Sequence, residues 1–184
     1  MKTQEDRDRF ELLVMPHLDA AYNFARWLTR NVHDAEDVTQ EAFVRAMTFF
    51  PGFHGCEAKP WLLAIVRNTY LTRLRRAKQH ASETLNDEMH ESGESALDMS
   101  SASELDNPEM ALVRKASAQL VNRALRRVPP DAREVLILRE LEDLSYKEIA
   151  HIVSAPIGTV MSRLHRGRRL LREELQRLDE ELLR

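Results

Sequence analysis

The sequence predicts an all-α protein, with two small helical domains joined by a flexible acidic linker. Helix-favouring Ala, Leu, Arg and Glu are frequent, while only 5 of the 184 residues are Gly and 6% are aromatic. The alternation of apolar and polar residues that marks a β-strand is scarce. Residues 79–108 contain 8 Asp/Glu, no Lys or Arg and few large apolar side chains, so they cannot bury enough surface to fold. The predicted domains are therefore 1–78 and 109–184, with the linker at 79–108.

Charge is unevenly distributed along the chain. Residues 1–78 hold 12 Lys/Arg and 10 Asp/Glu, and residues 109–184 hold 15 and 12, whereas the whole chain carries a net charge of −3. Two mildly basic domains therefore flank an acidic linker, which matters more than the overall charge. The single Cys56 excludes an internal disulfide and suits a reducing cytoplasm. There is no apolar signal-peptide core, and the longest apolar run, 61–66, is too short to cross a bilayer, so we expect a cytoplasmic protein without direct membrane insertion.

Three helical stretches make up the first domain. The apolar pattern of residues 10–30 predicts one helical face, which Pro16 should break into two pieces. Asp34 is expected to cap the second helix, because Asp is a preferred N-cap residue. The third helix is expected to begin near Pro60 and to run to about Lys78.

The second domain begins with a helix over residues 109–127, which Val128-Pro129-Pro130 should close. Asp131 is expected to cap the next helix. In that helix Val135, Leu136 and Leu138 should face the core.

A helix-turn-helix is the strongest local signal in the chain, over residues 144–172. Ser145 and Glu148 have the spacing of a capping box at the start of its first helix. The turn is expected at Ser154-Ala155, with Pro156 at the first position of the second helix. The second helix has a core-facing stripe. Its members are Ile157, Val160, Leu164 and Leu171.

Residues 145–172 carry six Lys/Arg against one acid. A helix of this kind can read base edges in the major groove with its first turns, while later arginines contact phosphates. The alternative is an amphipathic surface helix whose arginines complement the helix dipole.

The loop before the third helix contains aromatic residues, and the helix itself is basic. Such a combination suits single-stranded nucleic acid, in which bases stack on rings and cations follow the phosphates. The alternative is that Phe53 and Trp61 are core residues. His54 and Cys56 alone fall short of a zinc pattern. The sequence also shows no phosphate loop, carboxylate dyad or Ser/His/Asp order, so we expect no catalytic site, metal or cofactor.

Three segments carry a resemblance to a known family: DAEDVTQEAF at 34–43, AKPWLLAIVRN at 58–68 and LSYKEIAHIVSAPIGTVMSRLHRGRRLL at 144–171. In this order and spacing they resemble the extracytoplasmic-function (ECF) group of bacterial sigma factors, within the sigma-70 family. The resemblance implies that the two domains are sigma region two and region four. It further implies a subunit without enzymatic activity that binds core RNA polymerase and directs it to promoter DNA.

The resemblance also assigns roles to particular residues. Region two would dock on the coiled coil of the β′ subunit through Asp37, Gln40 and Glu41, and region four on the β flap. The −10 element would be melted and held by Phe53, Lys59, Trp61, Arg67, Asn68 and Arg73. The −35 element would be read by Thr159, Ser162, Arg163, His165, Arg166 and Arg168. Met161 and His165 depart from residues seen in many relatives, so the bases read there are expected to differ.

Two further expectations follow from the resemblance. Family members are usually held inactive by an anti-sigma factor, so we expect such a partner. The acidic linker would enter a positively charged channel of the polymerase; a solubilising tether is the alternative.

Two other functions remain open. A self-sufficient helix-turn-helix repressor or activator would need a dimer interface and a palindromic operator, and residues 31–78 would have no role in it. A thiol-based enzyme or redox sensor would depend on Cys56.

Overall fold

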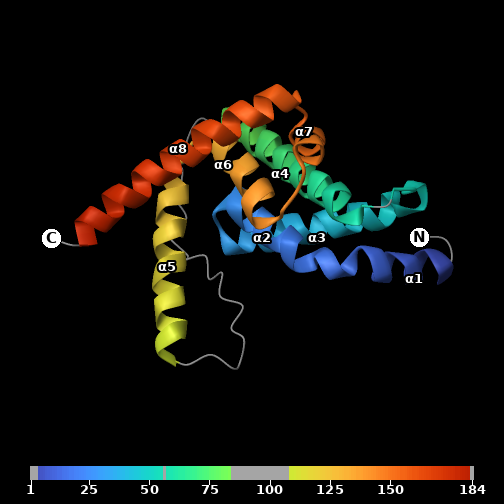
Figure 1. The fold of residues 1–184 in the computed structure, drawn as a ribbon. Helices are drawn as coiled ribbons and strands as arrows, with labels where there is room; N and C mark the ends of the chain where they lie inside the picture. Colours follow the sequence, from blue (N-terminus) through green and yellow to red (C-terminus); the bar gives the residue numbers. More distant parts are fainter. Residues whose placement is uncertain (1–3, 56, 84–107, 183–184) are drawn as a thin grey trace.

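The computed structural model describes residues 4–55, 57–83 and 108–182, and these form helices and short turns without a β-strand (Figure 1). This confirms the predicted all-α class. Most of the predicted linker, residues 84–107, lies outside the described residues, as does Cys56. The elements are α1 (Gln4–Leu13), η1 (Met15–His17), α2 (Leu18–Thr29), α3 (Val32–Phe49), η2 (Phe50–Gly52), α4 (Ala58–Glu83), α5 (Pro108–Arg127), α6 (Pro130–Leu136), η3 (Ile137–Leu141), α7 (Tyr146–Val153) and α8 (Ile157–Leu182).

Helices α2, α3 and α4 pack against one another, and α1 lies along them (Figure 1). The predicted break at Pro16 is confirmed, because the 3₁₀ turn η1 separates α1 from α2. The core of this half is built on side chains that are almost fully buried. They include Val14, Phe24, Val38, Ala42, Phe50, Leu62 and Leu63.

Two predicted N-caps are wrong, and helix α4 is longer than predicted. Asn31, in an extended conformation, caps α3 by accepting a hydrogen bond from the Asp34 backbone N–H at 3.2 Å. Pro129 precedes α6 without any side-chain cap, and Asp131 lies in the first turn. Both acids therefore sit just inside their helices, where the helix dipole still favours a negative charge. Helix α4 begins at Ala58 and continues to Glu83, into the stretch predicted to be linker.

In the second half, α8 runs across the ends of α5, α6 and α7 (Figure 1). Gly167 permits this close packing, because a Cβ built there would lie 2.8 Å from Leu136 Cδ1. The buried side of α8 includes Val160, Leu164 and Leu178. Ile157 is 41% exposed, so the core-facing stripe begins at Val160 and not, as predicted, at Ile157.

The two halves share one continuous hydrophobic core. Helix α7 packs directly on α4, and α6 lies between α8 and the helices of the first half (Figure 1). Buried side chains from Phe10 in α1 to Leu164 in α8 belong to a single cluster. This contact between halves joins residues far apart in the sequence, and the sequence did not predict it.

Candidate nucleic-acid interface

The helix-turn-helix has the geometry that its sequence predicted. The Ser145 side chain accepts from the Glu148 N–H at 3.3 Å, and Glu148 Oε2 accepts from the Ser145 N–H at 2.7 Å. This confirms the capping box, which satisfies two donors at the start of α7. Ser154 ends α7 in the left-handed conformation, with φ of 52°. Pro156 was predicted at the first helical position, but α8 begins one residue later, at Ile157. The Pro156 carbonyl accepts hydrogen bonds from the Thr159 and Val160 N–H groups.

The first turns of α8 present polar side chains away from the core. Ser162, His165 and Arg166 are exposed, and Thr159 is half-buried. Ser162 donates to the Thr159 carbonyl at 2.9 Å, which orients its hydroxyl along the helix. This group of side chains can therefore meet a groove without displacing any of the packing that holds α8.

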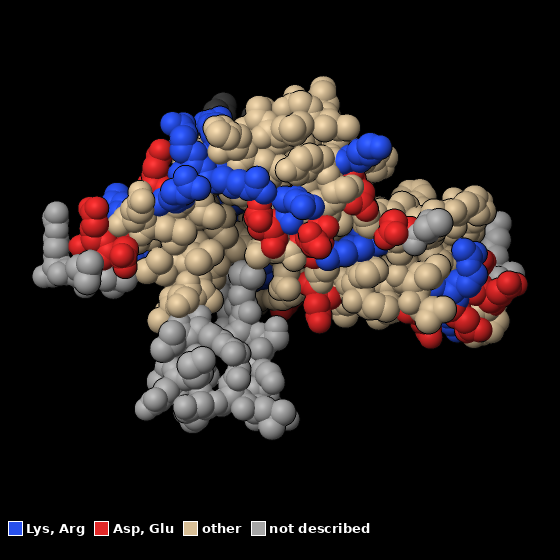
Figure 2. All heavy atoms as spheres, in the orientation of Figure 1, with Lys and Arg blue, Asp and Glu red and all other residues tan. Residues whose placement is uncertain are grey.

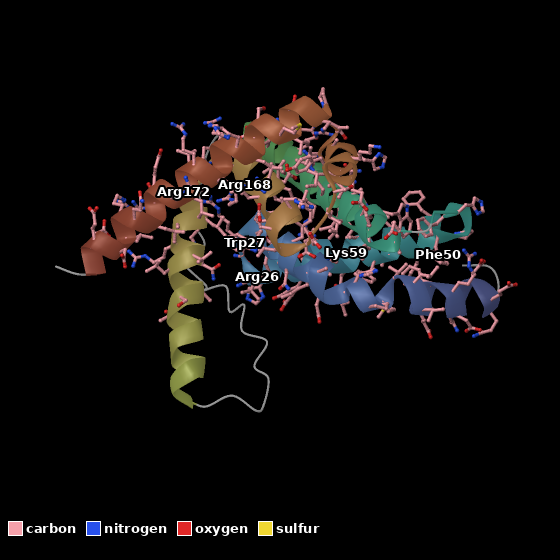
Figure 3. The ribbon with its side chains drawn as sticks, viewed as in Figure 1. Arg26, Trp27, Phe50, Lys59, Arg168 and Arg172 are labelled. Atoms are coloured by element: carbon pink, nitrogen blue, oxygen red, sulfur yellow. The ribbon has the colours of Figure 1, made fainter. Side chains whose placement is uncertain are left out.

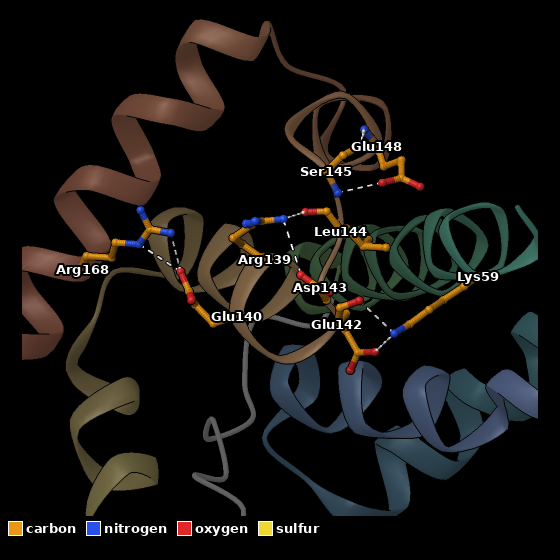
Figure 4. Close-up of polar contacts among 9 residues, drawn as sticks. All are labelled: Lys59, Arg139, Glu140, Glu142, Asp143, Leu144, Ser145, Glu148 and Arg168. Atoms are coloured by element: carbon orange, nitrogen blue, oxygen red, sulfur yellow. Dashed lines mark hydrogen bonds and ion pairs between the residues drawn. The ribbon is translucent and has the colours of Figure 1, made fainter.

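Arg163 and Arg168 were also predicted to contact the −35 element. Each forms an ion pair with an acid outside α8, Asp131 of α6 and Glu140 of η3. Arg163 Nε lies 3.5 Å from Asp131 Oδ2. Arg168 donates from Nε and Nη2 to Glu140 Oε1 at 2.9 and 2.6 Å (Figure 4). The hydrogen bond to Glu140 raises the pKa of Arg168. Both pairs are partly exposed to solvent, so they orient the two arginines without burying them.

In Figure 2, Lys and Arg side chains gather over the middle of α8, and acidic side chains lie directly beside them. Arg168 and Arg172, labelled in Figure 3, belong to this part of α8. A cluster of cations is one feature of a surface that contacts a phosphate backbone, although here acids pair with several of the arginines.

Aromatic rings from three elements support the loop before α4. The Phe53 and Trp61 ring centroids lie 4.7 Å apart, and those of Phe50 and Phe53 lie 5.9 Å apart. Phe53 is 7% exposed, so its ring is a core residue of the loop and offers no open face to a base. Trp61 is half-buried. Gly55 passes so close that an added Cβ would lie 3.0 Å from the Phe53 ring, which fits the compact turn.

The polar residues predicted to contact the −10 element are distributed along α4. Asn68 is exposed. Arg73 Nη2 lies 2.8 Å from Asp37 Oδ2 and its Nη1 lies 3.8 Å from Glu41 Oε2. Asp37 and Glu41 are two of the residues predicted to bind the polymerase, so an ion pair connects the two predicted surfaces across α3 and α4. Gln40 is exposed beside them.

Lys59 and Arg67 have partners that belong to the other half of the chain. Lys59 Nζ lies 2.8 Å from Glu142 Oε2 and donates to the Glu142 carbonyl at 2.9 Å. Arg67 Nε lies 2.6 Å from Glu134 Oε1, and both side chains are largely buried. Sequence reasoning missed Glu142 and Glu134 as the partners of Lys59 and Arg67. It likewise missed Glu140 as the partner of Arg168. Such a pairing depends on tertiary contact, so no local sequence pattern predicts it.

Among the described residues, no three His, Cys, Asp or Glu side chains are grouped closely enough to hold a metal ion. His54 is exposed in the loop. Within the same part of the chain, no helix combines the length and apolar character needed to span a membrane.

A capped helix-turn-helix and a basic helix behind an aromatic loop define a two-part nucleic-acid-binding protein. Family models agree with this division: "Sigma-70 region 2" matches residues 13–80, and "Sigma-70, region 4" matches residues 118–171. The "ECF RNA polymerase sigma factor SigW" of Bacillus subtilis is 34% identical over 94% of this chain and 92% of its own length. The "ECF RNA polymerase sigma-E factor" of Escherichia coli K12 is 34% identical over 94% and 90%.

Solved structures show the same fold. The sigma factor RpoE, in complex with the anti-sigma factor NepR from Bartonella quintana, has a TM-score of 0.67 at 24% identity, over 95% of this chain and 98% of that one. CnrH, in complex with the cytosolic domain of CnrY, has a TM-score of 0.58 at 23% identity, over 92% and 89%. The chain belongs to the sigma-70 family of RNA polymerase sigma factors, and within it to the ECF group.

Proposed function

We propose that this protein binds core RNA polymerase and directs it to promoters that carry a −35 and a −10 element. The observation that carries the proposal is the joint presence of both sigma regions, in order, with the helix-turn-helix of region four correctly capped and its polar side chains exposed. It acts in the cytoplasm, as a specificity subunit without catalytic activity, metal or cofactor.

The −35 element is read by α8. Thr159, Ser162, His165 and Arg166 lie along its outer side near the N-terminus, where a recognition helix meets base edges. Arg163 and Arg168 serve as phosphate contacts. Their ion pairs with Asp131 and Glu140 orient the two side chains. Phosphate contacts fix the register, while the exposed polar group supplies the sequence preference.

The −10 element is opened and held by α4 and the loop before it. Asn68 is exposed and can reach a base edge, while Lys59, Arg67 and Arg73 provide positive charge along the strand. Trp61 offers a partly exposed ring, and Phe53 contributes by holding the loop in shape. A base removed from the duplex costs a few kcal/mol, which stacking and hydrogen bonds at this surface offset.

The polymerase is engaged by the outer face of α3, through Asp37, Gln40 and Glu41 on the β′ coiled coil, with region four on the β flap. An anti-sigma factor regulates the protein. Support for that partner comes from two solved structures with this fold. RpoE was solved with the anti-sigma factor NepR, and CnrH was solved with the cytosolic domain of CnrY.

Run-off transcription tests the proposal. Core RNA polymerase is given pooled genomic DNA with and without the protein, and new transcripts are mapped. Discrete start sites that share two spaced upstream sequences support the sigma function. Retarded duplex DNA with the protein alone, and no new transcripts with polymerase, would instead indicate a self-sufficient regulator.

A further inference from the structure

A cavity of about 500 Å³ lies where the end of α2, the middle of α4 and the start of α6 meet. Its apolar lining includes Trp27, Leu28, Leu71, Leu74 and Ile137. Leu74 is 37% exposed, and Leu28 and Leu71 are half-buried, so the cavity is open to solvent. A cavity of this size, with apolar walls and a few polar groups, has the character of a small-molecule site.

Two arginines line the same cavity and converge on one carbonyl group. Arg30 Nη2 and Arg133 Nη1 donate to the Arg126 carbonyl oxygen at 3.3 and 3.4 Å. Arg126 lies in the last turn of α5, where the helix dipole amounts to about half a negative charge. Each guanidinium group brings a full positive charge and several N–H donors, so one carbonyl balances only a small part of the two groups.

The acids around the cavity do not neutralise these arginines. Asp131 and Glu134 also line it, but each is already paired with another arginine. Among the described residues, no carboxylate forms an ion pair with Arg30 or Arg133. The groups that act electrostatically on Arg133 in this part of the chain are Arg30, Tyr70 and Arg126, and none of them is an acid. The cavity therefore keeps an excess of positive charge.

Burial makes this excess costly at Arg133. Its side chain belongs to a residue that is only 5% exposed, so the charge has lost most of its hydration. Burial, and then the neighbouring charge of Arg30, lower the pKa of Arg133 to about 10, and the group remains charged at neutral pH. A buried charge is stable when an opposite charge pairs with it, and an anion in the cavity would supply that charge.

The backbone at Arg30 is a second observation that favours a ligand. Arg30 follows α2 with φ of 60°, in the left-handed region, where Gly is the usual residue. Residues with a side chain are strained in this conformation, and strained backbone clusters at functional sites. The side chain that this position retains is the guanidinium that lines the cavity.

We propose that this cavity binds a small organic anion, with its carboxylate or phosphate group between Arg30 and Arg133 and its apolar body against Leu28, Leu71 and Leu74. Guanidinium groups recognise carboxylate and phosphate oxygens through paired hydrogen bonds. The apolar walls favour an anion with an apolar body over a bare inorganic ion, because an inorganic ion would leave those walls uncovered. This ligand site is additional to promoter recognition and does not depend on it.

Isothermal titration calorimetry on the full-length chain tests the site without polymerase or DNA. The probes are 1-naphthyl phosphate and decanoate, which carry a phosphate and a carboxylate on an apolar body, and inorganic phosphate, which has no such body. At least one apolar probe should bind once per chain, and about tenfold or more tighter than inorganic phosphate, through burial of its apolar body. The tighter of the two apolar probes identifies the preferred anionic group.

Two variants each remove one guanidinium group with little strain on the fold. Arg30→Gly suits the left-handed backbone, and Arg133→Met keeps an unbranched apolar side chain at the buried position. Either change should weaken binding of the apolar probe about tenfold or more, because charge-assisted hydrogen bonds are lost. Circular dichroism checks that each variant keeps its helices.

Arg123→Ala is the matched control. Arg123 is exposed on α5 and does not line this cavity, so its loss should leave the affinity for the probe unchanged. An equal loss of affinity in all three variants would show a general attraction between cations and anions, and would refute the site.

Three other results would also overturn the proposal: no saturable binding of either apolar probe at millimolar concentration, equal affinity for inorganic phosphate, or parental affinity in both Arg30→Gly and Arg133→Met. Binding that is lost in these two variants and kept in Arg123→Ala supports it. None of these results bears on the sigma function, which run-off transcription tests separately.

Discussion

Gly167 offers the sharpest test of how region four is packed. A Cβ at this position would lie 2.8 Å from Leu136 Cδ1, 2.9 Å from Leu136 Cγ and 3.2 Å from the Ala132 carbonyl oxygen. Leu136 is 2% exposed, so its side chain has little room to move away. Gly167→Ala should therefore force α8 away from α6 or push Leu136 off its preferred rotamer.

Two opposing effects determine the magnitude. Ala is favoured over Gly inside a helix by about 1 kcal/mol, whereas an extra methyl in a filled core costs about 1–3 kcal/mol. Gly158, in the same helix, meets nothing within 4 Å and supplies the control. We expect Gly158→Ala to be neutral or stabilising, and Gly167→Ala to be less stable than Gly158→Ala by about 1–3 kcal/mol.

Urea unfolding followed by circular dichroism measures this difference. Equal stability of the two variants would refute the close approach of α8 and α6. A less stable Gly167→Ala that binds −35 DNA with unchanged preference would show that the recognition helix tolerates the displacement.

Three further predictions concern single side chains. Ser145→Ala should lower the free energy of unfolding by about 0.5–2 kcal/mol through loss of the α7 cap, measured by urea unfolding, and an unchanged midpoint would contradict the capping role. Arg166→Ala should weaken −35 recognition by about 1–3 kcal/mol; binding to a panel of −35 variants measures it, and an unaltered preference among them would remove Arg166 from base reading. Asn68→Ala should impair promoter opening, followed by permanganate reactivity, more than closed-complex binding, and equal losses in both would argue against its assigned contact with the melted strand.

The candidate site shows where sequence reasoning succeeds and where it stops. The capping box at Ser145 and Glu148 was predictable because it involves neighbours three residues apart, whose contact follows from helix geometry. The N-caps predicted at Asp34 and Asp131 were wrong. Several residues before each helix could have been the cap, and the backbone conformation, which the sequence does not give, places it at Asn31 and Pro129. Phe53 could be read as a stacking ring or as a core residue, and the structure places it in the core.

The sequence by itself determined the helical class, the two sigma regions and the outer side of the recognition helix. Each depends on local periodicity, capping or the order of motifs. Only the tertiary structure revealed that Glu134 and Glu142 hold Arg67 and Lys59, 67 and 83 residues away in the chain. The sequence does not show which residue a charged side chain will pair with, because an ion pair depends on where two distant helices meet. That meeting is set by packing across one shared core.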